Sequence, residues 1–191
     1  MIATALKYVT GFLNKEIKLQ YGLDSNPVLL SSLINPDGTV TENIENKLIL
    51  SLINIEHETT VNTTQQFHAT GNNSFNRKAP PVCLNLYLLA SANYDSKNYT
   101  EALKMISTLI GIFQANPYLN KENDPDMPVS IDLLRFEIFN LPIKELSHIW
   151  SGIGAKYVPS IIYKVRMLTI QEGQITEQIP GVGGVGGAAN T

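Results

Sequence analysis

The sequence predicts an α/β domain of the α+β kind, with a single mixed sheet of about five to six strands and about three flanking helices. Three amphipathic patterns with spacings of three or four residues indicate the helices, and apolar runs between them indicate the strands. The clearest strand follows Pro80-Pro81, a pair that cannot donate to a sheet ladder and closes the polar segment before it. At 191 residues the chain is long enough for one domain with its own core.

The first helix is predicted from the N-terminus to about Gln20. Its apolar residues step by three or four positions and share one face: Ile2, Leu6, Val9, Leu13 and Ile17. Gly22 is expected to end it. A short strand is predicted within residues 28–34. The turn Pro36-Asp37-Gly38 should reverse the chain after it, because proline presets φ and glycine supplies a positive φ.

Two apolar runs predict the centre of the sheet. Residues 47–56 are apolar on both pleat faces through most of their length, as in a strand covered on two sides, and residues 82–92 form the run after the double proline. Between them, residues 59–78 are rich in Thr, Gln, Asn and Gly. We expect a connection without regular structure there, which is either a functional or partner-ordered loop or a flexible hairpin tip.

The second helix is predicted over residues 99–113 and should end before Asn116-Pro117. Its expected buried stripe consists of Tyr99, Leu103, Ile106, Ile110 and Phe113. Residues 129–138 read as a strand whose apolar phase jumps by one position after Leu133, which indicates a bulge or bend.

The third helix is short and is predicted to begin near Pro142, with Trp150 on its apolar stripe as a core anchor. The last strand is predicted over residues 160–171. Tyr163, Val165 and Met167 should face one side and Lys164 and Arg166 the other, a pattern typical of a half-exposed or edge strand.

The expected domain comprises residues 1–173, and residues 174–191 are expected to form a flexible Gly-rich tail because apolar periodicity stops after Gln171. The net charge is −3, and the 14 basic residues form no cluster, so nucleic acid is not an expected partner. The chain starts without a signal-peptide pattern and has no apolar run long enough for membrane insertion, which favours a cytoplasmic protein.

The search for chemical motifs favours a protein that is not an enzyme. Residues 181–186 match the spacing of a dinucleotide-binding glycine loop, but only five residues follow, so no helix could supply its phosphate site. Cys83 is expected to be a buried side chain rather than a nucleophile. The three histidines lie far apart in the sequence, and neither a metal nor another cofactor is predicted. His57, between two glutamates, is the best catalytic candidate, although the same triplet is typical of a solvated strand end.

The order of several segments resembles one family. These are residues 48–56, the run Leu84-Asn85-Leu86-Tyr87-Leu88-Leu89 after the double proline, the helix of residues 103–113, Leu146 with Trp150, and Tyr157-x-Pro-Ser-x-x-Tyr163-Lys-Val165. Over roughly residues 2–173 the chain resembles the N-terminal domain of the cap proteins of phage-tail-like contractile injection systems, relatives of phage tail terminators. Some relatives carry a further C-terminal region, and the strand here continues with Ala90-Ser91-Ala92 where the family commonly has Leu-Thr-Ala.

The resemblance implies a tail-terminator-like fold and a structural role without cofactor or reaction. The implied protein is a hexameric ring that closes the distal end of the inner tube, ends its polymerisation and joins the last layer of contractile sheath. Its implied partners are other copies of itself, the inner-tube protein and the sheath protein, in a particle assembled in the cytoplasm. Two alternatives remain: a monomeric adaptor or assembly chaperone, and an enzyme with a pocket near His57.

Candidate contact residues follow from the long polar segment and the charged strand. For the tube we expect contacts from Gln65, Phe67, Asn72, Phe75, Arg77 and Lys78. For the sheath we expect contacts from Lys164, Arg166, Gln171 and Gln174. A long loop and an exposed edge strand would give each subunit the two unlike faces that a closed ring requires.

Overall fold

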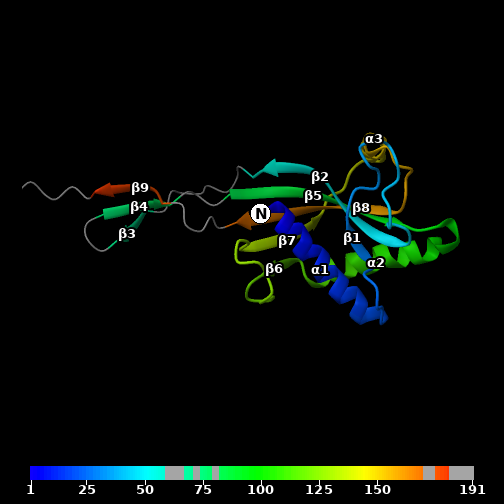
Figure 1. Ribbon diagram of the computed structural model, residues 1–191, viewed down its shortest axis with the longest axis horizontal. Helices are drawn as coiled ribbons and strands as arrows, with labels where there is room; N and C mark the ends of the chain where they lie inside the picture. Colours follow the sequence, from blue (N-terminus) through cyan, green and yellow to red (C-terminus); the bar gives the residue numbers. More distant parts are fainter. Residues whose placement is uncertain (59–66, 71–73, 79–81, 170–174, 181–191) are drawn as a thin grey trace, which may run out of the picture.

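The described residues form a curled six-stranded sheet, three helices and a separate three-stranded sheet (Figure 1). The structure, a computed structural model, describes residues 1–58, 67–70, 74–78, 82–169 and 175–180. The helices are α1 (Ile2–Tyr21), α2 (Tyr99–Ala115) and α3 (Ile143–Ile153), with a short 3-10 turn, η1 (Ser96–Asn98), before α2. The strands are β1 (Val28–Leu30), β2 (Lys47–His57), β3 (Phe67–Thr70), β4 (Ser74–Lys78), β5 (Val82–Asn93), β6 (Tyr118–Asn120), β7 (Leu133–Ile138), β8 (Ser160–Thr169) and β9 (Ile175–Pro180).

The main sheet has the order β1-β2-β5-β8-β7-β6 and confirms the predicted mixed α/β fold. Strand β1 runs parallel to β2, and every other neighbouring pair is antiparallel. The apolar run after the double proline is β5, which pairs with β2 on one side and β8 on the other. The expectation that the last strand could be an edge strand is wrong, because β8 lies between β5 and β7 and its backbone is paired on both sides.

The second sheet, β3-β4-β9, was not predicted. The segment 59–78, expected to lack regular structure, contains an antiparallel hairpin in which Phe67 pairs with Arg77. Within residues 174–191, Ile175–Pro180 form β9, which pairs with β4. This sheet lies beyond the ends of β2 and β5 in Figure 1. Residues 59–66, 71–73, 79–81, 170–174 and 181–191 lie outside the described part of the chain.

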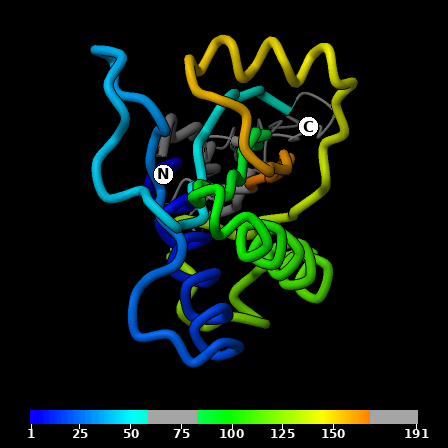
Figure 2. The backbone as a smooth tube through the Cα atoms, turned by 90° about the vertical axis from the view of Figure 1, so that its right-hand side faces the viewer, coloured from blue at the N-terminus to red at the C-terminus, as the bar shows by residue number. Residues whose placement is uncertain are grey.

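Helices α1 and α2 cover one face of the main sheet (Figure 2). Leu13 and Ile17 of α1 and Leu109 of α2 are fully buried in the larger core cluster. The predicted end of α1 is confirmed: Gly22 has φ 63° and ψ 38°, and its N–H donates to the carbonyl oxygen of Lys18 at 2.8 Å. A left-handed residue at this position closes the last helical turn, which is why glycine is favoured there.

Helix α3 and residues from the 31–46 segment pack on the opposite face. Trp150 is 4% exposed and belongs to a second cluster with residues of β2, β5 and β8, so its expected role as a core anchor is confirmed. The other buried members of this cluster are Leu33, Ile44, Ile49, Leu89 and Ile162. Strands β2, β5 and β8 therefore contribute residues to two separate cores, as expected for the centre of a sheet covered on both sides.

Two predictions about apolar phase are wrong. Tyr99 and Leu103, expected on the buried stripe, are 54% and 44% exposed, whereas Phe113 of the same stripe is buried as expected. The buried face of α2 also includes Met105 and Ile112. No bulge follows Leu133, because β7 begins there and pairs with β8 without a register shift. The apolar residues before it belong to an irregular segment, and the short edge strand β6 that pairs with β7 was not predicted.

Candidate protein-binding surfaces

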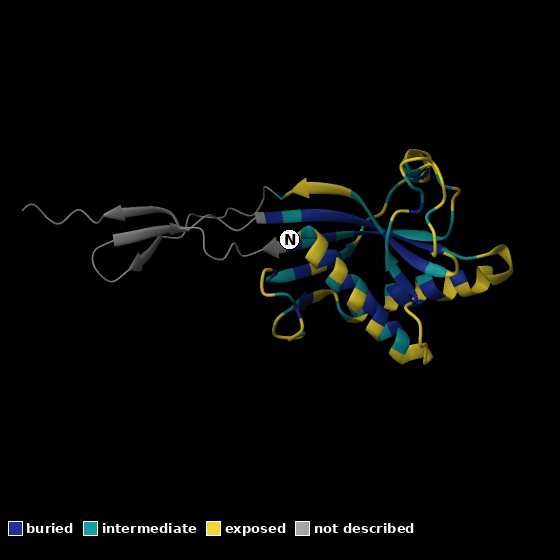
Figure 3. Cartoon of the chain, viewed as in Figure 1, coloured by how far each residue is buried: buried dark blue, intermediate teal, exposed yellow. Residues whose placement is uncertain are grey.

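A bulge in β2 determines which of its side chains share a face with Tyr87. Leu52 pairs with Leu88, but the next paired residue is Asn54, opposite Tyr87, so Ile53 is an extra residue in the strand. Because side chains alternate between faces, this insertion moves Asn54 and the residues after it to the opposite face from the one they would otherwise occupy. The second half of β2 is also exposed, unlike its first half (Figure 3).

The bulge completes a group of polar side chains that we call the polar sheet face: Asn54, Glu56, Asn85, Tyr87, Lys164 and Arg166. These residues form two rows across β2, β5 and β8. In one row Tyr87 pairs with Asn54 and Lys164, and in the other Asn85 pairs with Glu56 and Arg166. Strand β7 extends both rows with Glu137 and Arg135, which form an ion pair of 3.0 Å with each other. The face therefore carries charges of both signs.

The centre of the polar sheet face is buried and hydrogen-bonded. Tyr87 is 7% exposed, and its hydroxyl donates to Glu56 Oε2 at 2.7 Å. This hydrogen bond to a carboxylate, followed by burial, raises the pKa of Tyr87 to about 12. Asn85 Nδ2 donates to Glu58 Oε2 at 3.1 Å, and an Arg166 guanidinium nitrogen lies 3.6 Å from the same oxygen.

Two polar atoms of this face lack a partner within the described structure. They are Asn85 Oδ1 and Arg166 Nε, and both are buried. An unsatisfied buried polar atom is costly, typically about 1–3 kcal/mol, so each would gain from a complementary group supplied by water or another molecule. These atoms mark the centre of the face as a place where polar contacts are incomplete.

Beside the polar sheet face lies a groove of about 610 Å³, which we call the α3 groove. It runs between α3 and the bulged half of β2, and its lining includes the apolar residues Phe139, Leu141, Ile149 and Ile153. The ring of Phe139 contacts Tyr87 edge-on at a centroid distance of 4.8 Å. Glu56 from β2 and Glu145 from the first turn of α3 also line the groove, so it combines an apolar wall with two carboxylates.

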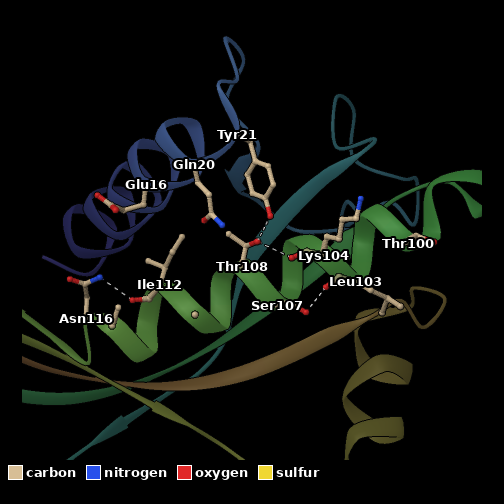
Figure 4. Close-up of a pocket in the computed structure, with 12 residues that line it drawn as sticks. Glu16, Gln20, Tyr21, Thr100, Leu103, Lys104, Ser107, Thr108, Ile112 and Asn116 are labelled. Atoms are coloured by element: carbon tan, nitrogen blue, oxygen red, sulfur yellow. Dashed lines mark hydrogen bonds between the residues drawn. The ribbon is translucent and has the colours of Figure 1, made fainter.

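A second groove, of about 680 Å³, separates the C-terminal half of α1 from the outer side of α2 (Figure 4). Tyr21 and Thr108 bridge it with a hydroxyl–hydroxyl distance of 2.7 Å. Because Thr108 donates its own proton to the carbonyl oxygen of Lys104, Tyr21 is the donor in this pair. Leu103, which sequence periodicity assigned to the core, is exposed and lines this groove.

The chemical candidates are not brought together. His57 ends β2 opposite Leu84 and is exposed, on the pleat face away from Glu56. Cys83 is 4% exposed, and burial raises the pKa of its thiol. Within the described residues, no three His, Cys, Asp or Glu side chains meet in an arrangement that could bind a metal ion. No helix in that part of the chain has the length and apolar character to cross a bilayer.

The predicted contact residues fall into two regions. Lys164 and Arg166 lie together on the polar sheet face, on an interior strand rather than an edge. Phe67 lies on β3, and Phe75, Arg77 and Lys78 lie on β4. Four further candidates lie outside the described residues: Gln65, Asn72, Gln171 and Gln174.

Sequence reasoning missed the α3 groove and most of the polar sheet face. No sequence motif marks Asn54, Tyr87 or Glu145. These residues line one groove because of the bulge at Ile53 and the position in which α3 packs. The apolar run before the bulge is apolar on both faces, so it gives no change of phase that could reveal the extra residue.

Comparison with known proteins agrees with the architecture. Among solved structures, a cryo-EM structure of the anti-feeding prophage cap, a tube-terminating cap, matches with a TM-score of 0.61 and 14% identity, covering 95% of this chain and 60% of that one. The sheath/tube terminator of PVC, an extracellular contractile injection system, in its extended state matches with a TM-score of 0.56 and 12% identity, covering 94% and 62%. The chain thus spans about three fifths of the length of these structures.

A comparison with curated proteins finds no match. The profile of the Pvc16 N-terminal domain family matches residues 6–183, a range that includes most of α1, all of α2 and α3, and both sheets. This match extends over far more than half of the 191 residues, and it agrees with the fold shared with the two terminator structures. The chain therefore belongs to the Pvc16 N-terminal domain family.

Proposed function

We propose that this protein is a structural cap that ends the inner tube of a contractile injection system. The observation that carries the proposal is the match of 95% of the chain to a tube-terminating cap, together with membership of the Pvc16 N-terminal domain family. In this proposal six copies form a ring on the distal end of the tube, stop its polymerisation and join the last layer of sheath. Assembly takes place in the cytoplasm, and the ring becomes part of the finished particle.

The proposed tube contacts lie on the three-stranded sheet and the proposed sheath contacts on the polar sheet face. The first set includes Arg77 and Lys78 of β4, a strand far from α3 in Figure 1. The second set centres on Lys164 and Arg166, and Arg166 Nε lacks a hydrogen-bond partner within the described structure. Because β8 is paired on both sides, sheath contacts there would use side chains rather than addition of a strand.

Imaging of tube ends tests the proposed function. The protein is co-expressed with the inner-tube protein of the same system, and tube length and tube ends are examined by negative-stain microscopy. We expect ring-capped tubes that are shorter than tubes formed without the cap. Tubes of unchanged length with bare ends would refute the proposal, and a monomer bound along tube walls would favour an adaptor or chaperone.

Charge reversal tests the tube contact separately. We expect Arg77→Glu combined with Lys78→Glu to reduce capping, because both residues belong to the proposed tube-facing sheet. Lys97→Glu is the matched control, since Lys97 is exposed in η1 and outside both proposed contact regions. Equal capping by the reversed variant and the control would place the tube contact elsewhere on the molecule.

A further inference from the structure

Among the described residues, the α3 groove is lined by acidic side chains and by no basic one. Both of its charged lining residues, Glu56 and Glu145, are carboxylates, and both are exposed. Glu56 accepts hydrogen bonds from Tyr87 and, at 3.4 Å, from Asn54. The ion pairs within the described part of the chain involve other carboxylates, those of Glu58, Glu101 and Glu137. An apolar groove with unpaired carboxylates suits a segment that presents an apolar side chain next to lysine or arginine.

The outer side of α1 presents such a segment, which we call the α1 stripe: Lys7, Gly11, Lys15 and Leu19. These residues are four positions apart, so they lie along one face of the helix, and all are exposed. Leu19 is 74% exposed, so most of its side chain is available for contact with another molecule. Lys18 adds a third basic residue in the last turn. The exposed residues of α1 include no carboxylate, because Glu16 is half-buried beside α2.

The α3 groove and the α1 stripe lie on opposite faces of the main sheet (Figure 2). One subunit therefore cannot bring its own stripe into its own groove. Two unlike patches on opposite sides allow head-to-tail contacts between copies. Such contacts close into a ring when equal rotations from one copy to the next add up to 360°.

We infer that the α1 stripe of one copy docks in the α3 groove of the next copy and forms the subunit interface of the ring. In this interface Leu19 enters the apolar part of the groove, and Lys15 and Lys18 approach the carboxylates of Glu145 and Glu56. The charge complementarity orients the helix, and the leucine supplies buried apolar area at the centre of the contact. This inference rests on the proposed ring-forming function and assigns the surfaces through which copies meet.

Disulfide trapping tests the interface directly. Leu19→Cys and Gly152→Cys place one thiol on the stripe and one in the groove, and a side chain at Gly152 meets no atom within 4 Å. The native Cys83 is buried and is the only cysteine in the chain, so it does not compete. Because oxidation traps each encounter covalently, even weak self-association accumulates as linked product at high protein concentration.

A head-to-tail interface makes a specific pattern on a non-reducing gel. The double-cysteine variant should give a ladder of dimers, trimers and larger species, and a mixture of the two single variants should give dimers only. Dimers of Leu19→Cys alone would indicate a two-fold contact and overturn the inference. Absence of the ladder would also overturn it, as would an equal ladder from Leu19→Cys paired with Lys97→Cys, a control position outside both patches.

Charge reversal supplies the second test. Glu145→Lys should weaken the ladder about tenfold, Lys15→Glu should do the same, and the two changes together should restore it because the attraction is rebuilt with opposite signs. Failure of the combined variant to recover would overturn the pairing. The tube assay keeps the two proposals apart. Capped tubes without a ladder would reject only the interface, and a ladder without capped tubes would reject only the cap function.

Discussion

Replacing Asn14 with alanine should destabilise the fold more than any other single change to a polar side chain of α1. Asn14 is 8% exposed, and its side chain binds both backbone groups of Val28 in the edge strand β1. Asn14 Oδ1 accepts from the Val28 N–H at 2.9 Å, and Asn14 Nδ2 donates to the Val28 carbonyl oxygen at 2.9 Å. The asparagine thus takes the place that a further strand would occupy beside β1.

The expected loss follows from the groups that the substitution leaves behind. A buried N–H and a buried C=O of Val28 would both lose their partner, and each such loss typically costs about 1–3 kcal/mol. We therefore expect Asn14→Ala to lower the free energy of unfolding by about 2–4 kcal/mol, since relaxation and water entry recover part of the penalty. For a domain stable by about 5–15 kcal/mol, this is a large fraction of the total.

Urea unfolding monitored by the fluorescence of Trp150, the single tryptophan of the chain, measures this loss. Asn116→Ala is the matched control, because Asn116 donates only within its own helix end, to the carbonyl oxygen of Ile112 at 3.0 Å, and should cost less than about 1 kcal/mol. If Asn14→Ala unfolded within about 0.5 kcal/mol of the wild type at an unchanged m-value, the side chain would not be holding β1 and the reasoning would be refuted.

Three further predictions concern the helix end, the polar sheet face and the irregular segment before β7. Gly22→Ala should destabilise the protein by about 1 kcal/mol, because Gly22 has a left-handed φ of 63°. Gly11→Ala should stabilise it by about 0.5–1 kcal/mol, because Gly11 lies inside α1 and a Cβ there would meet open space. Thermal unfolding of the two variants measures both effects. The stability contributed by Tyr87 should be fully present below about pH 10 and lost as the pH rises towards about 12, because the pKa of Tyr87 is raised in the folded state. The urea midpoint of a Tyr87→Phe variant should therefore depend less on pH in this range than that of the wild type. An equal pH dependence of the two midpoints would contradict the prediction. Ile131→Ala should lower the free energy of unfolding by about 2–5 kcal/mol and Val129→Ala by less than about 0.5 kcal/mol, since these residues are 0% and 69% exposed. Similar urea midpoints for the two variants would contradict the expected effect of burial.

Helix α2 shows how far sequence periodicity could go. Its boundaries were close to those predicted, but its buried face was predicted only in part, because apolar residues cover about half of the helix circumference, a wider arc than the core buries. A stripe through Leu103 and one through Met105 both fit a helical period, and only docking against the sheet chooses between them. The choice leaves Leu103 beside the groove between α1 and α2.

Strand β8 illustrates a second limit. Alternation of Lys164 and Arg166 with buried residues correctly predicted two unlike faces, and Tyr163, Val165 and Met167 are buried as expected. Alternation reports which face of a strand is covered and carries no information on whether its edges are paired. The interior position of β8, and with it the exclusion of strand addition at that site, came from the register with β5 and β7.

The candidate site was the least predictable part of the molecule. The sequence indicated that protein contacts were a better explanation than chemistry, and it pointed to Lys164 and Arg166. It could not reveal the α3 groove, because Glu56 and Glu145 are far apart in the chain and line the same groove only through the bulge in β2 and the position in which α3 packs. Neither feature has a local signature in this sequence.

The amino-acid sequence by itself determined the mixed α/β class, the three helices, the two strands predicted at residues 47–56 and 82–92, and the family to which the chain belongs. These follow from local periodicity, turn residues and an apolar pattern that each segment carries on its own. Only the tertiary structure decided the register shift at Ile53, the burial of Ile131, the hydrogen bonds of Asn14 to β1 and the groove beside α3. Those depend on which distant segments pack together, and the free energy of that packing is a property of the whole fold rather than of any one segment.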